Sequence, residues 1–267
     1  MRKYWVVFRI ALSERLVYRA DFFIATFLRF TPIITTIVLW RAVYDGSGQA
    51  ELDGLAYQQM VAYYLVVMIT RAFGSMPGLS GEIAGDIRDG GLRKYLLQPI
   101  DYLRYLMMLR CAHKMVYFVM AAAPYALVFW VCRGFLPEWD AASGWLPTVL
   151  TLVLAFLLGF AMNALVGMLG FWFLEVGSFI GVVMTAQYFL SGHMFPLSLL
   201  PDGVETVVTL LPFAYETYYP TLLIMQKLTP AETWRVILVQ VAWVVALLAA
   251  TRWAWIRGLR RYAAYGG

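Results

Sequence analysis

Charged residues are scarce in this chain, and their scarcity excludes an ordinary soluble domain. Only 14% of the 267 residues are Asp, Glu, Lys or Arg, whereas 62% are hydrophobic. Soluble globular domains are about 25% charged and about 45–50% apolar. Several windows of this sequence contain about 20 mostly apolar residues, the length of helix that crosses a hydrocarbon layer about 30 Å thick. The sequence therefore predicts an all-α, polytopic membrane protein.

The chain also has only two histidines and two cysteines, which argues against several kinds of catalytic or metal site. His113 and His193 fall on opposite sides of the predicted membrane, so they cannot form a metal cluster within one chain. Neither the phosphate-binding pattern G-x-x-x-x-G-K-[ST] nor the nucleophile pattern G-x-S-x-G occurs. We expect this chain to have no enzymatic activity, cofactor or metal of its own, and to take its energy from another chain or from an ion gradient.

Six apolar segments are candidates for membrane spans within a single transmembrane domain over residues 1–267. They lie near residues 22–43, 57–78, 108–132, 146–173, 177–195 and 233–256. Before the first of them, residues 1–21 place apolar side chains at helical spacing among four arginines. This pattern is typical of an interfacial helix that lies along the inner leaflet.

The basic residues are distributed unevenly between the connecting segments. If the N-terminus is inside, the outer side carries mainly Arg133 and Lys227, and the inner side carries many more. The inner set is Arg2, Lys3, Arg9, Arg15, Arg19, Arg88, Arg93, Lys94, Arg104, Arg257, Arg260 and Arg261. The positive-inside rule then predicts that both termini and the loop at 79–105 are cytoplasmic. Basic residues at membrane edges indicate contact with anionic lipids, and not with nucleic acid.

The loop at 79–105 is the longest charged stretch between apolar segments. Leu79, Ile83 and Ile87 recur every fourth residue, which predicts a short amphipathic helix that ends at Gly90 and Gly91. Such a loop is either a solvated connector or a helix that docks in a groove of a partner protein.

The segment at 191–220 has four prolines and is too interrupted for a regular span, yet it is too apolar for a free loop. We expect a re-entrant helical hairpin on the external side, which would place Glu205 and Glu216 near the external surface.

Small and polar residues within the spans are candidates for packing or for a transport pathway. Ala155, Gly159, Asn163 and Gly167 recur every fourth residue, a stripe that permits close helix approach. It serves either packing within one subunit or an interface between subunits. Possible pathway residues are Arg29, Arg71, Glu175 and Gln187, although the two arginines are near enough to span ends to extend to the interface instead.

Taken together, these features resemble permease subunits of the type-2 ABC exporter family over essentially the whole chain. The resemblance is carried by the six spans, the opening MRKYWVVFRIALSERLVYRADF, the loop GGLRKYLLQPIDYLRY, the prolines before the last span and the ending RGLRRYAAYGG. The quoted segments resemble more closely a bacterial subgroup of permeases that are typically encoded beside an ATPase and a second permease.

The resemblance implies a half-transporter in the bacterial inner membrane. Two permeases, identical or different, would form the pathway, and separate ABC ATPase subunits that hold ATP and Mg²⁺ would drive an amphipathic or lipid-like substrate outward. The loop at 79–105 would be the ATPase coupling element, with these residues: Glu82, Ile83, Asp86, Ile87, Gly90, Leu92 and Pro99.

Two other functions remain open from the sequence. An ion-coupled secondary transporter normally has paired intramembrane ionisable groups and inverted repeats. A membrane-embedded transferase or hydrolase has a polar catalytic cluster at one depth. Neither pattern is evident in the sequence.

Overall fold

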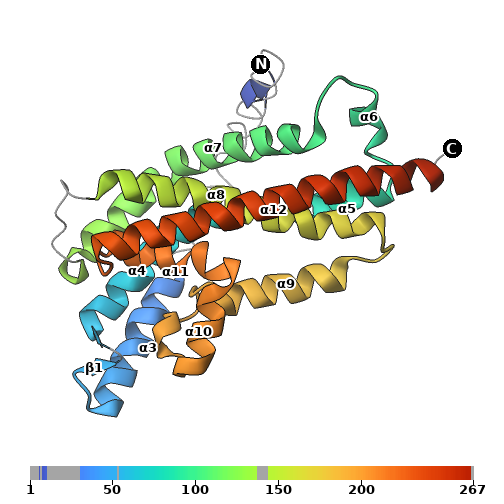
Figure 1. Ribbon diagram of the computed structural model, residues 1–267. Coiled ribbons are helices and arrows are strands. Elements are labelled where there is room, and N and C mark those ends of the chain that lie inside the picture. Colours follow the sequence, from blue (N-terminus) through green and yellow to red (C-terminus); the bar gives the residue numbers. More distant parts are fainter. Residues whose placement is uncertain (1–5, 7, 11–30, 53, 137–143, 266–267) are drawn as a thin grey trace. The chain divides into compact units, whose positions relative to one another are not determined.

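The computed structural model describes residues 6, 8–10, 31–52, 54–136 and 144–265, and helices dominate this part of the chain (Figure 1). By their contacts these elements form two compact units. The first unit contains Met1–Leu65 and Arg93–Pro137, and the second contains Val66–Leu92 and Glu138–Gly267. Helix α4 (Tyr57–Gly74) passes from the first unit into the second.

The first unit contains helix α3 (Thr31–Ser47), a two-stranded hairpin of β1 (Glu51–Leu52) and β2 (Leu55–Ala56), helix α6 (Arg93–Leu96), helix α7 (Tyr102–Val131) and the short helix η1 (Arg133–Phe135). The Tyr44 hydroxyl donates a hydrogen bond of 2.6 Å to the Leu55 carbonyl, which fixes the hairpin against α3. Helix α7 begins where the Asp101 carboxylate accepts the Arg104 backbone N–H at 3.0 Å, the usual side-chain cap of a helix start.

The second unit is built on α8 (Trp145–Met168), which continues into η2 (Leu169–Phe171), and on α12 (Pro230–Tyr265) beside it (Figure 1). The Thr151 hydroxyl donates to the Gln240 side-chain oxygen at 2.9 Å, and the Thr251 hydroxyl donates to the Ala161 carbonyl at 3.2 Å. Hydrogen bonds between apolar helices satisfy polar groups that lipid cannot satisfy.

Helix α12 begins with a reciprocal cap. The Thr229 backbone N–H donates to the Glu232 carboxylate at 2.8 Å, and the Glu232 N–H donates to the Thr229 hydroxyl at 3.3 Å. Pro230 occupies the first helical position, where its missing N–H costs no hydrogen bond. The remaining elements of the second unit are α5 (Leu79–Arg88), α9 (Gly177–Leu190), η3 (Leu197–Leu199), α10 (Asp202–Leu210), η4 (Pro212–Tyr215) and α11 (Tyr218–Ile224).

The expected six spans are confirmed only in part. Among the described residues, four helical stretches are long and apolar enough to cross a membrane: Tyr57–Arg88, Tyr102–Val131, Trp145–Phe171 and Pro230–Tyr262. The expected span at 177–195 corresponds to α9, which has 14 residues and a length of about 21 Å, short of a hydrocarbon layer of about 30 Å.

Two further expectations fall largely outside the described residues. Of the span at 22–43, only the part from Thr31 onward belongs to α3. Of the interfacial helix at 1–21, residues 6 and 8–10 are helical, and the others lie outside the described residues, as does Arg29.

The expected re-entrant segment at 191–220 is a series of short helices: η3, α10, η4 and the start of α11. Prolines stand at the boundaries, because Pro196 precedes η3, Pro201 precedes α10 and Pro212 opens η4. Val204, Val207 and Leu210 form an exposed apolar side of α10, at 49%, 61% and 66% exposure.

Candidate functional site

The amphipathic helix expected in the loop at 79–105 is α5, but its apolar side packs within the chain. Helix α4 ends at Gly74, the backbone turns at Gly78 with a φ of 75°, and α5 begins at Leu79. Ile83 is fully buried and Ile87 is 5% exposed. Two of the expected coupling residues are therefore covered within the chain, because the amphipathic pattern identified an apolar side without identifying what covers it.

The cover is the C-terminal end of α8 together with η2. A Cβ atom built on Gly167 would lie 2.7 Å from Ile83 Cβ and 2.8 Å from the Ser80 carbonyl oxygen. One built on Gly170 would lie 3.2 Å from Ala84 Cα. Gly167 and Gly170 thus let α5 approach α8 and η2 closely. Fully burying an isoleucine side chain such as that of Ile83 stabilises a fold by about 1.5–3 kcal/mol relative to leaving it in water.

The end of α5 is fixed by backbone geometry. Gly90 has a φ of 76°, a conformation that glycine adopts without strain, and the Leu92 N–H donates to the Asp86 carbonyl at 3.0 Å. Leu92 is fully buried, so it anchors the chain after the turn. The Arg88 guanidinium donates to the Asp89 carboxylate at 2.9 Å, which lowers the pKa of Asp89. The exposed side of α5 includes Glu82, Arg88 and Asp89.

Exposed apolar residues of the loop lie after α5, at the end of α6. Leu96 is 46% exposed and Leu97 is 87% exposed, and the exposed Arg93 and Lys94 precede them. Pro99 is also exposed. The sequence contained the signal for this feature, since two adjacent leucines follow two basic residues in a segment predicted to be cytoplasmic.

The stripe on α8 packs on α4 and α5 of the same chain. A Cβ built on Gly159 would collide with the Gly74 carbonyl oxygen, so α4 and α8 approach through backbone atoms. The Ser80 hydroxyl donates to the Asn163 carbonyl at 2.9 Å, and the Asn163 side-chain nitrogen donates to the Gly159 carbonyl at 2.9 Å. Ala155 is fully buried.

A buried carboxylate lies at the crossing of α4 and α8, and we did not identify it as a site residue from the sequence. Glu216, which follows η4, is 3% exposed, and a Cβ on Gly74 would lie 2.5 Å from its Cγ. The Gln187 side-chain nitrogen donates to its carboxylate at 2.5 Å. Glu216 is therefore buried within the chain, in a slot that two glycines leave open.

Other polar residues continue this buried cluster. Thr217 is 2% exposed, and the hydroxyls of Thr70 and Thr221 lie 2.9 Å apart. The Gln240 side-chain nitrogen donates to the Tyr215 carbonyl at 2.9 Å. Polar and ionisable groups are costly within a membrane and commonly mark a pathway there.

Of the four residues expected along a pathway, Gln187 contacts this cluster through its hydrogen bond to the Glu216 carboxylate. Glu175 is exposed, and its carboxylate accepts the Gly177 backbone N–H at 2.8 Å, which organises the start of α9. Arg71 is exposed, one turn before Gly74. The described residues contain no group of three or more His, Cys, Asp or Glu side chains that could hold a metal ion.

The apolar helices and their hydrogen-bonded core define a multi-pass membrane protein. The family model described as an ABC-2 family transporter protein matches residues 30–266, so the chain belongs to the ABC-2 transporter family. This membership makes the chain the membrane component of an ABC transporter, and not its ATPase. Comparisons with curated proteins and with solved structures gave no significant match.

Proposed function

We propose that this chain is the permease subunit of an ATP-driven exporter that moves an amphipathic or lipid-like substrate outward across a bacterial inner membrane. The family match over residues 30–266 is the observation that carries this proposal. Because the sequence has no phosphate-binding loop, separate ATPase subunits with ATP and Mg²⁺ supply the energy. The excess of basic residues supports a cytoplasmic position for both termini and for the loop at 79–105.

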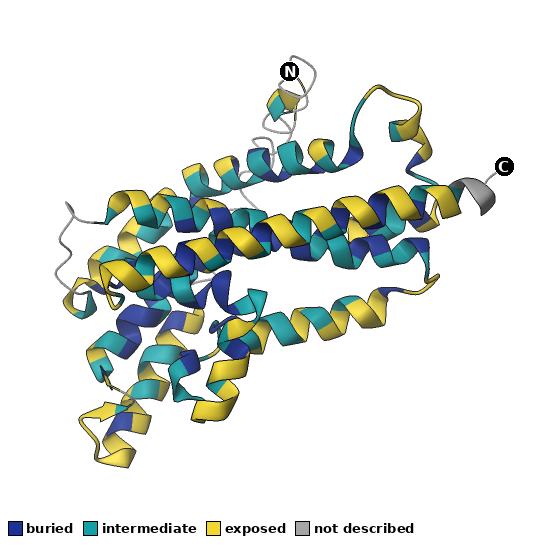
Figure 2. Ribbon diagram, viewed as in Figure 1, coloured by how far each residue is buried: buried dark blue, intermediate teal, exposed yellow. Residues whose placement is uncertain are grey.

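A second permease completes the transport unit in this proposal. Only 11% of the most apolar window of α7 is buried within the chain, and α9 has no buried residue (Figure 2). These helices therefore offer lateral surface to lipid and to a second permease, whether identical or paralogous.

The coupling element of this proposal has two parts with different roles. Leu97, the most exposed apolar residue of the loop, inserts into a groove of the ATPase, with Arg93 and Lys94 beside it. Glu82 and Asp86 lie on α5, which transmits the displacement to α8 because Ile83 packs against Gly167. Ile87, Gly90, Leu92 and Pro99 hold the shape of this element.

The pathway in this proposal passes the buried polar cluster at Glu216 and Gln187. Their hydrogen bond lies where α4 and α8 cross, so a relative movement of these helices changes the surroundings of the carboxylate. The exposed apolar side of α10 supports a re-entrant position for the segment at 191–220, in which valines and a leucine contact lipid.

The first test is purification of the tagged chain from native membranes in a mild detergent. We expect an ATPase subunit with a phosphate-binding loop to copurify, and we expect vanadate to inhibit the ATP hydrolysis of the complex. Reconstituted vesicles that contain a fluorescent phospholipid then report ATP-dependent outward movement. A fully folded chain that copurifies without any ATPase would refute the proposal.

An ion-coupled transporter is the second candidate, and the buried carboxylate of Glu216 is the observation that favours it. The variant Glu216→Gln separates the two functions, because an amide keeps the shape of the side chain but cannot exchange a proton. Ion-coupled transport would be lost in this variant, whereas ATP hydrolysis by the partner would continue.

A further inference from the structure

One face of α12 is exposed along the helix (Figure 2). The residues on this face change from apolar to basic toward the C-terminal end of the helix. Its first part contains Trp234, Leu238, Val241 and Val245, which are 50%, 68%, 38% and 61% exposed. Its last part contains the exposed residues Arg252, Trp253, Ile256, Arg257 and Arg260, which we call the basic face. At about 100° per residue these five positions fall within an arc of about 140°.

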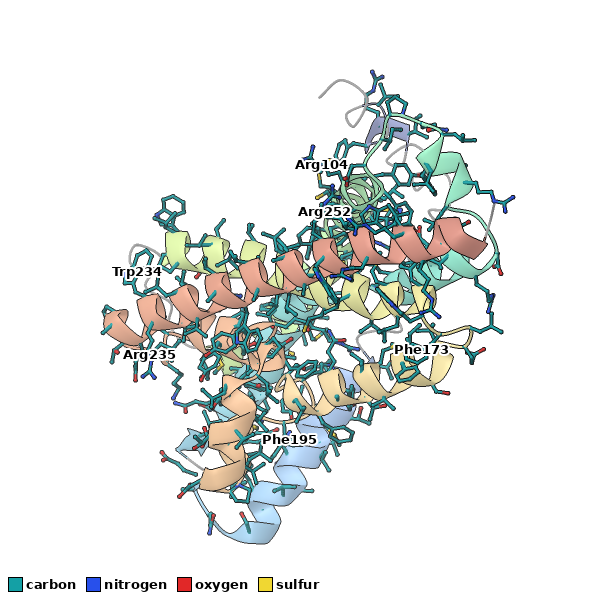
Figure 3. The ribbon with its side chains drawn as sticks, turned by 45° about the vertical axis from the view of Figure 1, so that its right-hand side comes forward. Arg104, Phe173, Phe195, Trp234, Arg235 and Arg252 are labelled. Atoms are coloured by element: carbon teal, nitrogen blue, oxygen red, sulfur yellow. The ribbon has the colours of Figure 1, made fainter. Side chains whose placement is uncertain are left out.

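Two exposed tryptophans mark the width of a hydrocarbon layer on this helix. Trp234 and Trp253 are 19 positions apart, or about 28 Å along the helix axis. Residues 236–251 between them carry no charged side chain, and Arg235 and Arg252 bound this stretch (Figure 3). Because tryptophan is enriched at both membrane interfaces, the spacing places Trp253 at the boundary between hydrocarbon and headgroups.

The arginines beyond Trp253 then lie at the depth of the lipid headgroups. Arg257 and Arg260 follow Trp253 by four and seven residues, about 6 and 10 Å along the axis. The headgroup layer is about 5–8 Å thick on each side, and the flexible arginine side chain extends this range. The Arg257 guanidinium carbon lies 5.7 Å from the centre of the Trp253 ring, so the cation and the aromatic anchor form one surface.

We propose that the basic face of α12 binds an anionic phospholipid headgroup of the adjacent leaflet. The guanidinium groups of Arg257 and Arg260 contact the phosphate, and Trp253 and Ile256 contact the upper acyl chain. Arg252 adds positive charge at the hydrocarbon boundary. This inference specifies the lipid partner within the proposed function, and it requires no ATPase.

The test measures lipid selectivity of the purified, delipidated chain in a neutral detergent by native mass spectrometry. Phosphatidylglycerol and phosphatidylcholine are added at equal concentrations, and the bound fractions are compared. We expect the wild type to bind more phosphatidylglycerol than phosphatidylcholine. In the variant Arg257→Gln, Arg260→Gln the ratio of the two bound lipids should fall by a factor of at least about five, because one basic residue near a charged surface contributes about 1 kcal/mol.

The matched control is the variant Arg133→Gln, Arg235→Gln, which removes two exposed arginines outside the basic face. It should keep the preference, and thermal melting should show that both double variants are folded. High salt should abolish the preference of the wild type, because the attraction is electrostatic. An equal loss in both variants, or no loss in the first, would overturn the proposal. Either outcome leaves the transport proposal untouched, since no nucleotide or ATPase is present.

Discussion

A close approach of α4 and α8 in the second unit gives the sharpest stability prediction. At Gly159 the backbone of α8 meets the Gly74 carbonyl oxygen of α4, and an added Cβ would lie about 1 Å inside the shortest separation that real Cβ atoms keep. The obstacle is a backbone atom, so no rotamer change can relieve the collision. The substitution Gly159→Ala therefore forces α4 and α8 apart.

The magnitude follows from the cost of overpacking. Extra methyl or methylene groups in a packed core cost about 1–3 kcal/mol, and the rigid contact at Gly159 belongs in the upper part of this range. Alanine recovers up to about 1 kcal/mol through its higher helix propensity. The net loss is about 2 kcal/mol, which corresponds to a Tm lower by about 4–8 °C for a chain of this size.

The matched control is Gly181→Ala on α9, because a Cβ there meets no atom within 4 Å. This variant should melt at the wild-type temperature or slightly above it. Both proteins are purified in the same detergent and melted while intrinsic fluorescence is recorded. If Gly159→Ala melts no lower than Gly181→Ala, the close approach of α4 and α8 is incorrect.

Three further predictions test the proposed coupling element, the buried carboxylate and the segment at 191–220. Ile83→Asp should prevent accumulation of folded protein, because it buries a charge at a cost of several kcal/mol. Leu97→Asp, at an exposed position, should fold normally and lose the copurifying ATPase. A folded Ile83→Asp protein would contradict the packing of α5. Gln187→Leu should lower the free energy of unfolding by about 1–3 kcal/mol, because it removes the side chain that donates a hydrogen bond to the Glu216 carboxylate. The control Gln58→Leu, at an exposed position, should have little effect. Equal melting temperatures of the two variants would argue against the hydrogen bond. In a background without Cys111 and Cys132, Asp202→Cys should react with an impermeant thiol reagent from outside, because Asp202 is exposed. Thr217→Cys should not react, since Thr217 is 2% exposed. Rapid labelling of Thr217→Cys would refute the buried position of Thr217.

The sequence predicted features that depend on composition and local pattern. The membrane class, the helical fold and the family follow from apolar windows and terminal motifs, and the family match confirms the last of these. The helix at 79–88 was also predicted, from apolar residues at every fourth position and from the two glycines that follow it. Each of these signals lies within a few neighbouring turns of the chain.

Features that depend on distant segments were missed or misjudged. The burial of Ile83 requires Gly167, which is far away in the sequence. The periodicity of apolar residues alone does not distinguish a side chain that α8 covers from one that is exposed and docks to another protein. The slot around Glu216 requires glycines on α4 and α8, which are distant from Glu216 in the sequence, so no local pattern revealed it. Six spans were predicted, whereas four helices of the described residues are long and apolar enough to cross a membrane. Apolar composition alone did not reveal that the helix in the fifth segment, α9, is too short.

The hydrogen bond from Ser80 to Asn163 also has a consequence for biosynthesis. The two residues are 83 positions apart, so at about 5–20 residues per second α5 leaves the ribosome about 4–17 s before the residue that it will contact. During this interval the glycine backbone at Gly74 and the apolar side of α5 have no cover from α8. Insertion of this protein thus includes a waiting period, in which the nascent second unit depends on the insertion machinery or on lipid to shield the surface that α8 later occupies.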